Sequence, residues 1–120
     1  MGVYVDGMVT PVPKRYIAAY VRISRMFGEV WRAHGALEYR ECIADDVKWG
    51  KRTSFPRSVK LKRGEVVCLS WTLYKSRKHR DQVIAKAMKD PRVVSFMKSK
   101  KPPFDMKRMY FGGFKSVVTL

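Results

Sequence analysis

The sequence predicts an α+β fold, in which helices cover one face of an antiparallel sheet, and two observations support this prediction. Residues 3–12 and 66–74 are rich in the β-branched and aromatic residues that are typical of strands. From Pro13 to Gly35, apolar residues recur at spacings of four and three, the pattern of a helix with one buried face. The chain has 120 residues, so we expect residues 1–120 to form a single domain.

The first half of the chain predicts a strand, a helix and a second strand. The strand at 3–12 ends at prolines, and its Asp6-Gly7 step predicts a bulge or the close approach of another backbone. Gly35 suits the end of the following helix, because glycine readily adopts a left-handed conformation. Residues 36–47 predict the second strand, whose alternation places Glu41 on the same face as two large apolar neighbours.

The middle of the chain predicts a basic connection, a central strand and two helices. Residues 48–63 contain seven lysines and arginines and no acid, and we expect a long connection with a short strand near 58–61. The strand at 66–74 has the length and residue types of a sheet centre. Ser76 is expected to cap a helix, and Asp90, followed by proline, to begin a separate short one.

The end of the chain predicts a basic turn at 98–103 and a last strand at 108–120, with a bulge at Gly112-Gly113. The resulting order is strand, helix, strand, strand, helix, strand, with an extra short helix before the last strand. This is the split βαβ order of the ferredoxin-like fold.

A sheet covered on one face leaves its other face in need of cover. Apolar residues from three strands cannot all point toward two helices; they are Val3, Val5, Leu69, Trp71, Leu73, Met109 and Phe111. A homodimer that packs sheet against sheet satisfies this requirement, and we expect one.

Several short strings in the sequence follow a known pattern in order and span nearly the whole chain. They include Tyr4-Val5-Asp6-Gly7, Gly35-Ala36-Leu37, Ala44-Asp45-Asp46-Val47, Pro103-Phe104-Asp105, Lys107-Arg108-Met109 and Gly112-Gly113-Phe114. In these strings the chain resembles the YbaA-like family of small bacterial proteins of unknown function. The resemblance implies a dimeric α+β barrel and supplies no reaction. The strong positive charge departs from the family pattern, so a nucleic-acid role cannot be carried over from the family.

The charge of the chain is strongly asymmetric. Its 26 lysines and arginines exceed its 10 acidic residues, giving a formal charge of +16, which favours polyanionic partners. Residues 1–47 are balanced, so the whole excess lies in residues 48–120. The alternative interpretation is that the cations simply form a solvated surface.

One candidate function is therefore nucleic-acid binding through residues 48–63, with 75–80 as a second basic patch. Aromatic side chains interleaved with cations suit base stacking. The candidate residues are Lys48, Trp49, Lys51, Arg52, Phe55, Arg57, Lys60, Lys62 and Arg63, with Lys75, Arg77, Lys78 and Arg80 in the second patch.

The leading candidate function is a small-molecule pocket between the helices and the sheet. Asp6 and Glu41 are the candidates for acid–base chemistry, because burial can move the pKa values of two nearby carboxyl groups apart. The expected lining is Tyr4, Asp6, Glu41, Trp71 and Tyr110. The competing interpretation is that the carboxylates pair with the abundant cations and that the aromatic residues are core.

No cofactor or metal is expected. His34 and His79 lack metal-ligand spacing with each other or with a cysteine, and Cys42 and Cys68 are expected to be reduced, buried thiols. No stretch has the apolar length of a membrane span, and the N-terminus does not resemble a secretory signal. We therefore expect a soluble, cytoplasmic protein, and no sequence feature decides whether it is an enzyme.

Overall fold

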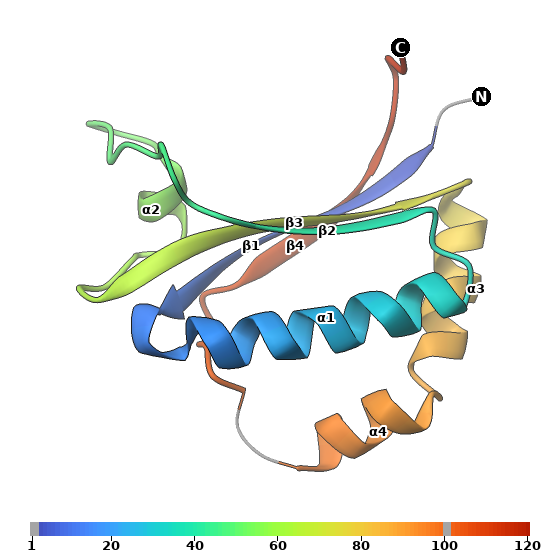
Figure 1. Ribbon diagram of the computed structural model, residues 1–120. Helices are drawn as coiled ribbons and strands as arrows, with labels where there is room; N and C mark the ends of the chain where they lie inside the picture. The colour runs from blue at the N-terminus through green and yellow to red at the C-terminus, as the bar shows by residue number, and fades with distance from the viewer. Residues whose placement is uncertain (1–2, 100–101) are drawn as a thin grey trace.

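The computed structural model describes residues 3–99 and 102–120, and Figure 1 shows how their helices and strands are arranged. The elements in chain order are β1 (Tyr4–Pro13), η1 (Lys14–Tyr16), α1 (Ile17–Ala33), β2 (Glu38–Ile43), α2 (Phe55–Ser58), β3 (Glu65–Tyr74), α3 (Arg77–Ala87), α4 (Pro91–Lys98) and β4 (Tyr110–Lys115). Residues 100 and 101 of the predicted basic turn lie outside the described residues.

The four strands form one sheet in the order β2-β3-β1-β4, with every neighbouring pair antiparallel. Neither β1 and β2 nor β3 and β4 are adjacent, so each pair is joined by helical connections across an intervening strand. This arrangement confirms the predicted α+β, ferredoxin-like fold.

The helix boundaries follow the predicted capping signals. Gly35, just beyond α1, has a φ of 116°, a value that glycine adopts without strain. Ser76 accepts a hydrogen bond from the backbone N–H of His79 at the start of α3. Asp90 does the same for the N–H of Arg92 at the start of α4.

Several local predictions were wrong. The segment near 58–61 is not a strand, because Ser54 caps the short helix α2 and Pro56 occupies its first turn. The register of β1 with β4 runs without interruption through Gly7 and Gly112, so neither predicted bulge forms. Gly113 instead leaves room for the ring of Tyr4, which a Cβ at this position would overlap. The strands β2 and β4 are also shorter than predicted.

Helices α1, α3 and α4 lie on one side of the sheet, whereas α2 and the loop before it lie on the other (Figure 1). We call the first side the inner face. The opposite side, beyond the part that α2 covers, is the open face. None of the helices in the described ranges is long and apolar enough to cross a membrane.

The two faces have an unusual distribution of polarity. On β3, the inner face carries Ser70 and Thr72, which are buried, and the open face carries Leu69, Trp71 and Leu73, which are half-buried. Half-covered antiparallel sheets usually place apolar residues toward their helices and polar residues toward solvent. The sheet therefore has polar groups under its helices and apolar groups on the side that lacks them.

The helix α1 approaches β2 closely at Gly28. A Cβ built on Gly28 would lie 2.5 Å from Cδ1 of Tyr39, closer than carbon atoms can pack. Glycine inside a helix ordinarily lowers stability by about 1 kcal/mol relative to alanine. The close contact with Tyr39 explains why glycine nevertheless occupies this position.

We predict that Gly28→Ala lowers the free energy of unfolding by about 1–3 kcal/mol, because overpacking outweighs the gain in helix propensity. Urea unfolding followed by tryptophan fluorescence measures this change. In a Tyr39→Ala background the ring is absent, and the same Gly28→Ala change should stabilise the protein. Stabilisation in the wild-type background would contradict the close-packing explanation.

Candidate functional site

A cavity of about 480 Å³ lies between the inner face of the sheet and the helices. Its volume falls within the range of about 300–1,000 Å³ that is usual for small-molecule sites. Its apolar walls include Ile23, Phe27, Ile84, Phe96, Phe104 and Met109, from α1, α3, α4 and the segment after them. Its floor is the inner face of the sheet, where Thr10, Ser70 and Thr72 bring hydroxyl groups.

Glu41 lies in the wall of this cavity where β2 faces α1. Its Oε1 accepts a hydrogen bond from Oγ of Ser24 at 2.7 Å, and its Oε2 accepts one from the hydroxyl of Tyr20 at 3.0 Å. Burial raises the pKa of Glu41 above its usual value of 4.5, and the two hydrogen bonds partly offset this effect. Within residues 3–99 and 102–120, Glu41 forms no ion pair.

Asp6 also lines the cavity, from β1, but its surroundings differ. One of its oxygens lies 3.0 Å from Nη1 of Arg80, whose guanidinium also lies over the ring of Tyr4. Burial raises the pKa of Asp6, and the charge of Arg80 opposes this shift. The carboxylate of Asp6 is thus held by a cation, whereas that of Glu41 is held only by hydroxyl groups.

The two carboxylates share the cavity without forming a pair. Glu41 is opposite Ser70, Asp6 is opposite Thr72, and β3 lies between them, which separates their Cα atoms by on the order of 10 Å. The sequence-based hypothesis is that burial moves the pKa values of these two nearby carboxyl groups apart; both groups line the same cavity, but they are not in contact with each other.

The other residues of the predicted lining do not border the cavity. Tyr4 is on the inner face but packs in a core cluster with Tyr74 and Val83 at the end of the sheet. Trp71 and Tyr110 lie on the open face, where Trp71 donates a hydrogen bond to Glu38 at 2.8 Å. Tyr110 donates one to Ser58 at 2.8 Å.

The remaining acidic residues and the histidines are dispersed. Glu38 lies on the open face, and Asp45 and Asp46 are exposed in the loop after β2. His34 is 3.1 Å from Asp90, while Nδ1 of His79 accepts a hydrogen bond from a backbone N–H. In the described part of the chain, no group of three or more histidine, cysteine or acidic residues is arranged to hold a metal ion.

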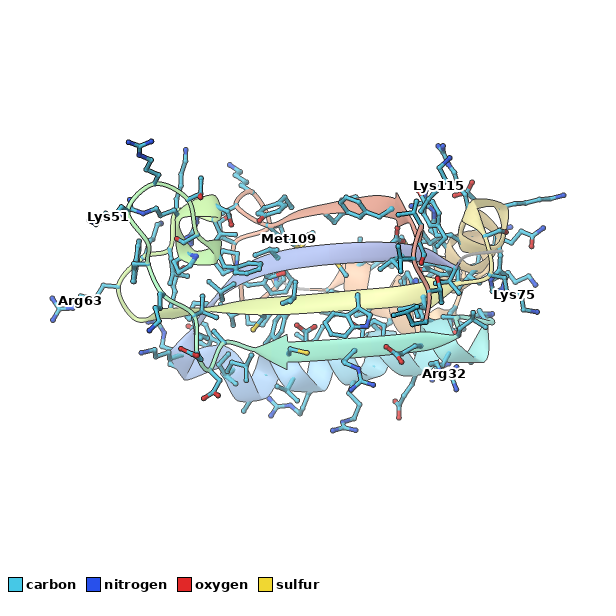
Figure 2. The ribbon with its side chains drawn as sticks, turned by 90° about the horizontal axis from the view of Figure 1, so that it is seen from above. Arg32, Lys51, Arg63, Lys75, Met109 and Lys115 are labelled. Atoms are coloured by element: carbon cyan, nitrogen blue, oxygen red, sulfur yellow. The ribbon has the colours of Figure 1, made fainter. Side chains whose placement is uncertain are left out.

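The two predicted basic patches lie at opposite ends of the sheet. Figure 2 shows Lys51 and Arg63 at one end and Lys75 and Lys115 at the other. Arg57 is occupied with its own loop, since its guanidinium donates to the backbone oxygens of Trp49 and Gly50. The two predicted patches therefore lie apart from each other.

Sequence reasoning missed the hydroxyl groups that hold Glu41. Tyr20, Ser24 and Phe27 fall on the same face of α1, so helical spacing placed Tyr20 and Ser24 toward the sheet. Ser24 is only 5% exposed although it is polar, and its burial is explained by the contact with Glu41. The sequence does show a serine on the apolar face of a helix, but this signal does not identify Glu41 as the partner of Ser24.

Residues 3–106 match the family model described as a protein of unknown function, DUF1428. The chain belongs to the DUF1428 family. It is 42% identical over 115 residues to the uncharacterized protein YbaA of Escherichia coli K12, covering 96% of this chain and 97% of that protein. The YbaA protein of Shigella flexneri matches with the same values. These relatives confirm the resemblance to the YbaA-like family, and they indicate no specific function.

Two solved structures share the fold of this DUF1428 member at low sequence identity. One is a dimeric ferredoxin-like protein from an uncultured marine organism, 11% identical over 100% of both chains, with a TM-score of 0.56. The other is a nipsnap family protein of unknown function from Agrobacterium tumefaciens, 16% identical over 96% of this chain and 88% of that one, also with a TM-score of 0.56. They support the ferredoxin-like fold.

The raised pKa of Glu41 predicts a specific pH dependence of stability. Because the folded state binds the proton more tightly than the unfolded state, this contribution is present below the usual pKa of 4.5 and is lost as pH rises through the folded-state pKa. We expect Glu41→Gln, which is always neutral, to gain stability relative to the wild type between about pH 4 and about pH 8.

Urea unfolding of both proteins across this range measures the difference. Asp45→Asn is the matched control, because Asp45 is an exposed carboxylate in the loop directly after β2. A constant difference between Glu41→Gln and the wild type at all pH values would show that burial does not perturb Glu41.

Proposed function

We propose that this protein binds a small, largely apolar molecule in the cavity between the inner face and helices α1, α3 and α4. The observation that carries this proposal is the combination of apolar walls with a floor of hydroxyl groups and two carboxylates in one hollow. Small-molecule sites typically combine apolar walls with a few convergent polar groups.

The polar groups also restrict the ligand. Glu41 accepts hydrogen bonds, so it favours a ligand that presents an N–H or O–H donor. In residues 3–99 and 102–120, Glu41 forms no ion pair, so a second anion beside it would not be neutralised there, which disfavours acidic ligands. We infer that the ligand is neutral or cationic near Glu41 and apolar elsewhere.

The ligand-binding proposal predicts that N-phenyl-1-naphthylamine, a neutral apolar amine that fluoresces in apolar surroundings, binds the protein. Ile23 lines the cavity from α1, and Ile23→Trp should weaken binding by about 10-fold or more by filling it. Fluorescence titration at constant protein concentration measures both affinities.

Val21→Trp is the matched control, because Val21 lies on the same helix, 43% exposed and outside the cavity. Its affinity for the probe should stay within about twofold of the wild-type value. Equal weakening by both variants, or no binding by the wild type, would refute the ligand site.

We also propose that two copies of the chain form a homodimer through their open faces. Phe114 is 63% exposed there, beside the half-buried side chains of Val5 and Leu73. On β2, the charged residues of this face, Glu38 and Arg40, lie 3.5 Å apart and partly neutralise each other. An apolar sheet face with little net charge fits a second copy of itself better than a polyanion. The marine protein with this fold is described as dimeric, which supports the expectation of a homodimer.

Nucleic-acid binding is the alternative function. The exposure of Trp49 (52%) and Phe55 (46%) among the cations of residues 48–63 favours it, since exposed aromatic rings can stack on bases. The separation of the two basic patches by the apolar open face weighs against it. The cavity therefore supports the small-molecule function more directly.

The homodimer proposal predicts a mass of about 28 kDa by light scattering at micromolar concentration, twice the 14.0 kDa of one chain. Phe114→Glu should shift the protein to monomer, because it places a charge at the centre of the apolar contact. Val21→Glu introduces the same charge on an exposed position of α1 and should leave the dimer intact. A monomeric wild type would overturn the proposal.

A further inference from the structure

Glu41 borders two hollows at once. Besides the cavity, a second hollow of about 560 Å³ lies on the surface of the molecule, between α1 and the edge strand β2. We call it the outer groove. Ser24, Tyr39 and Glu41 line both the cavity and the outer groove. These three residues therefore form the wall between the ligand site proposed above and the solvent-facing groove.

The three side chains in this wall are linked by hydrogen bonds. The hydroxyl of Tyr39 lies 3.0 Å from Oγ of Ser24, and Ser24 in turn donates to Oε1 of Glu41 at 2.7 Å. Because Ser24 donates its proton to Glu41, its oxygen accepts that of Tyr39. The chain of hydroxyls ends at a carboxylate that has no cation beside it within the described residues.

This geometry suits a base that acts on a molecule inside the cavity. Asp6 forms an ion pair with Arg80, which neutralises its negative charge. Glu41 is oriented by hydroxyl groups, which do not neutralise its charge. A carboxylate in apolar surroundings is a stronger base than one in water, because its anion is poorly solvated.

We propose, on the basis of the ligand-binding function above, that Glu41 is a general base that removes a proton from carbon in an apolar substrate, and that Ser24 and Tyr39 pass this proton to the outer groove. The substrate class is a neutral carbon acid, a molecule whose C–H bond lies next to a carbonyl or an equivalent electron-withdrawing group.

The step balances without a cofactor or an oxidant. Glu41 takes the proton, the electron pair of the C–H bond becomes part of a new C=C bond, and the carbonyl oxygen becomes an enolate oxygen. Hydroxyls on the cavity floor, those of Thr10, Ser70 and Thr72, are the available donors to this oxygen. The hydroxyls of Ser24 and Tyr39 first turn about their C–O bonds, so that Ser24 accepts from Glu41 and donates to Tyr39. The proton of Glu41 then moves to Ser24, that of Ser24 to Tyr39, and that of Tyr39 to water in the outer groove. For an isomerisation, Glu41 regains a proton from water by the reverse relay, through Tyr39 and Ser24, and delivers it to a different carbon of the enolate, which restores the carboxylate.

The probe for this chemistry is 5-nitro-1,2-benzisoxazole, a neutral aromatic molecule that opens when a base removes its ring C–H proton. The C–H electron pair forms a nitrile, the N–O bond breaks, and the oxygen leaves as a coloured phenolate. We expect saturable ring opening that is faster than with acetate at the same concentration. N-phenyl-1-naphthylamine should inhibit it competitively, because both molecules occupy the cavity.

Glu41→Gln should lower the ring-opening rate by about 100-fold or more, within the range expected for general-base catalysis, while N-phenyl-1-naphthylamine still binds. Asp45→Asn removes an exposed carboxylate in the loop after β2 that borders neither the cavity nor the outer groove, and it should leave the rate unchanged. Glu41→Asp is a second variant, because it keeps the negative charge but shortens the side chain by one methylene group, which moves the carboxylate away from the substrate. It should also lower the rate by about 10-fold or more.

Ser24 is assigned a positioning and relay role, and the pH profile tests it. The rate should rise with pH as Glu41 ionises, and Ser24→Ala should move the midpoint to higher pH, because Ser24 donates to the carboxylate. The titratable and charged groups near Glu41 are Tyr20, Tyr39, Cys68 and Asp6 with its partner Arg80, and in the outer groove Arg25, Glu29, Arg32 and Glu38.

The hydroxyl and thiol groups that face Glu41 stay protonated over the pH range of this rate measurement. Burial raises the pKa of Tyr39 to about 12 and that of Cys68 to about 12, and it also raises the pKa of Tyr20. An unchanged midpoint in Ser24→Ala would assign Ser24 a structural role alone.

The outcomes separate this inference from the proposed function. If the probe amine binds but ring opening is no faster than with acetate, or if Glu41→Gln and Glu41→Asp match the wild type, Glu41 is not a base and ligand binding stands. If the amine does not bind and ring opening is absent, both proposals fail. Ring opening that the amine does not inhibit would place the reaction outside the cavity and overturn the inference.

Discussion

The packing of α1 against β2 is the contact on which the site depends. At Gly28 the helix backbone approaches the ring of Tyr39 as closely as sterics permit, and one turn earlier Ser24 donates a hydrogen bond to Glu41. These two contacts fix the height and rotation of α1 above the sheet. The cavity exists because α1 is held in this position at the β2 edge, while α3, α4 and the segment after them enclose the remaining sides (Figure 1).

The polarity of the sheet links the site to the proposed assembly. Hydroxyls and carboxylates under the helices are tolerated in a protein interior only where partners satisfy them, and here α1 supplies hydroxyl groups and Arg80 supplies a cation. Leucine, tryptophan and phenylalanine on the open face have the opposite requirement, since burial would remove apolar area from water. This distribution of polar and apolar groups therefore underlies both the proposed ligand site and the proposed dimer.

Alternation along a strand separates its side chains into two sets, but it does not decide which set faces the helices. For β3 the apolar set contains Trp71, which the sequence left as a candidate both for the pocket lining and for the face without helices. The pairing of Tyr110 with Val9 places Tyr110 on the open face in the same way. In contrast, Asp6 and Glu41 do lie in one cavity, because their register positions relative to β3 both point to the inner face.

The sequence by itself determined the order of the elements, the caps at Ser76 and Asp90, the family and the net charge, because each depends on neighbours along the chain or on composition. The tertiary structure alone decided which face of the sheet the helices cover, which hydroxyls hold Glu41, and that the cations gather at two separate ends (Figure 2). These features depend on strand register and on contacts such as that of Tyr20 with Glu41, 21 residues apart, which local patterns do not encode.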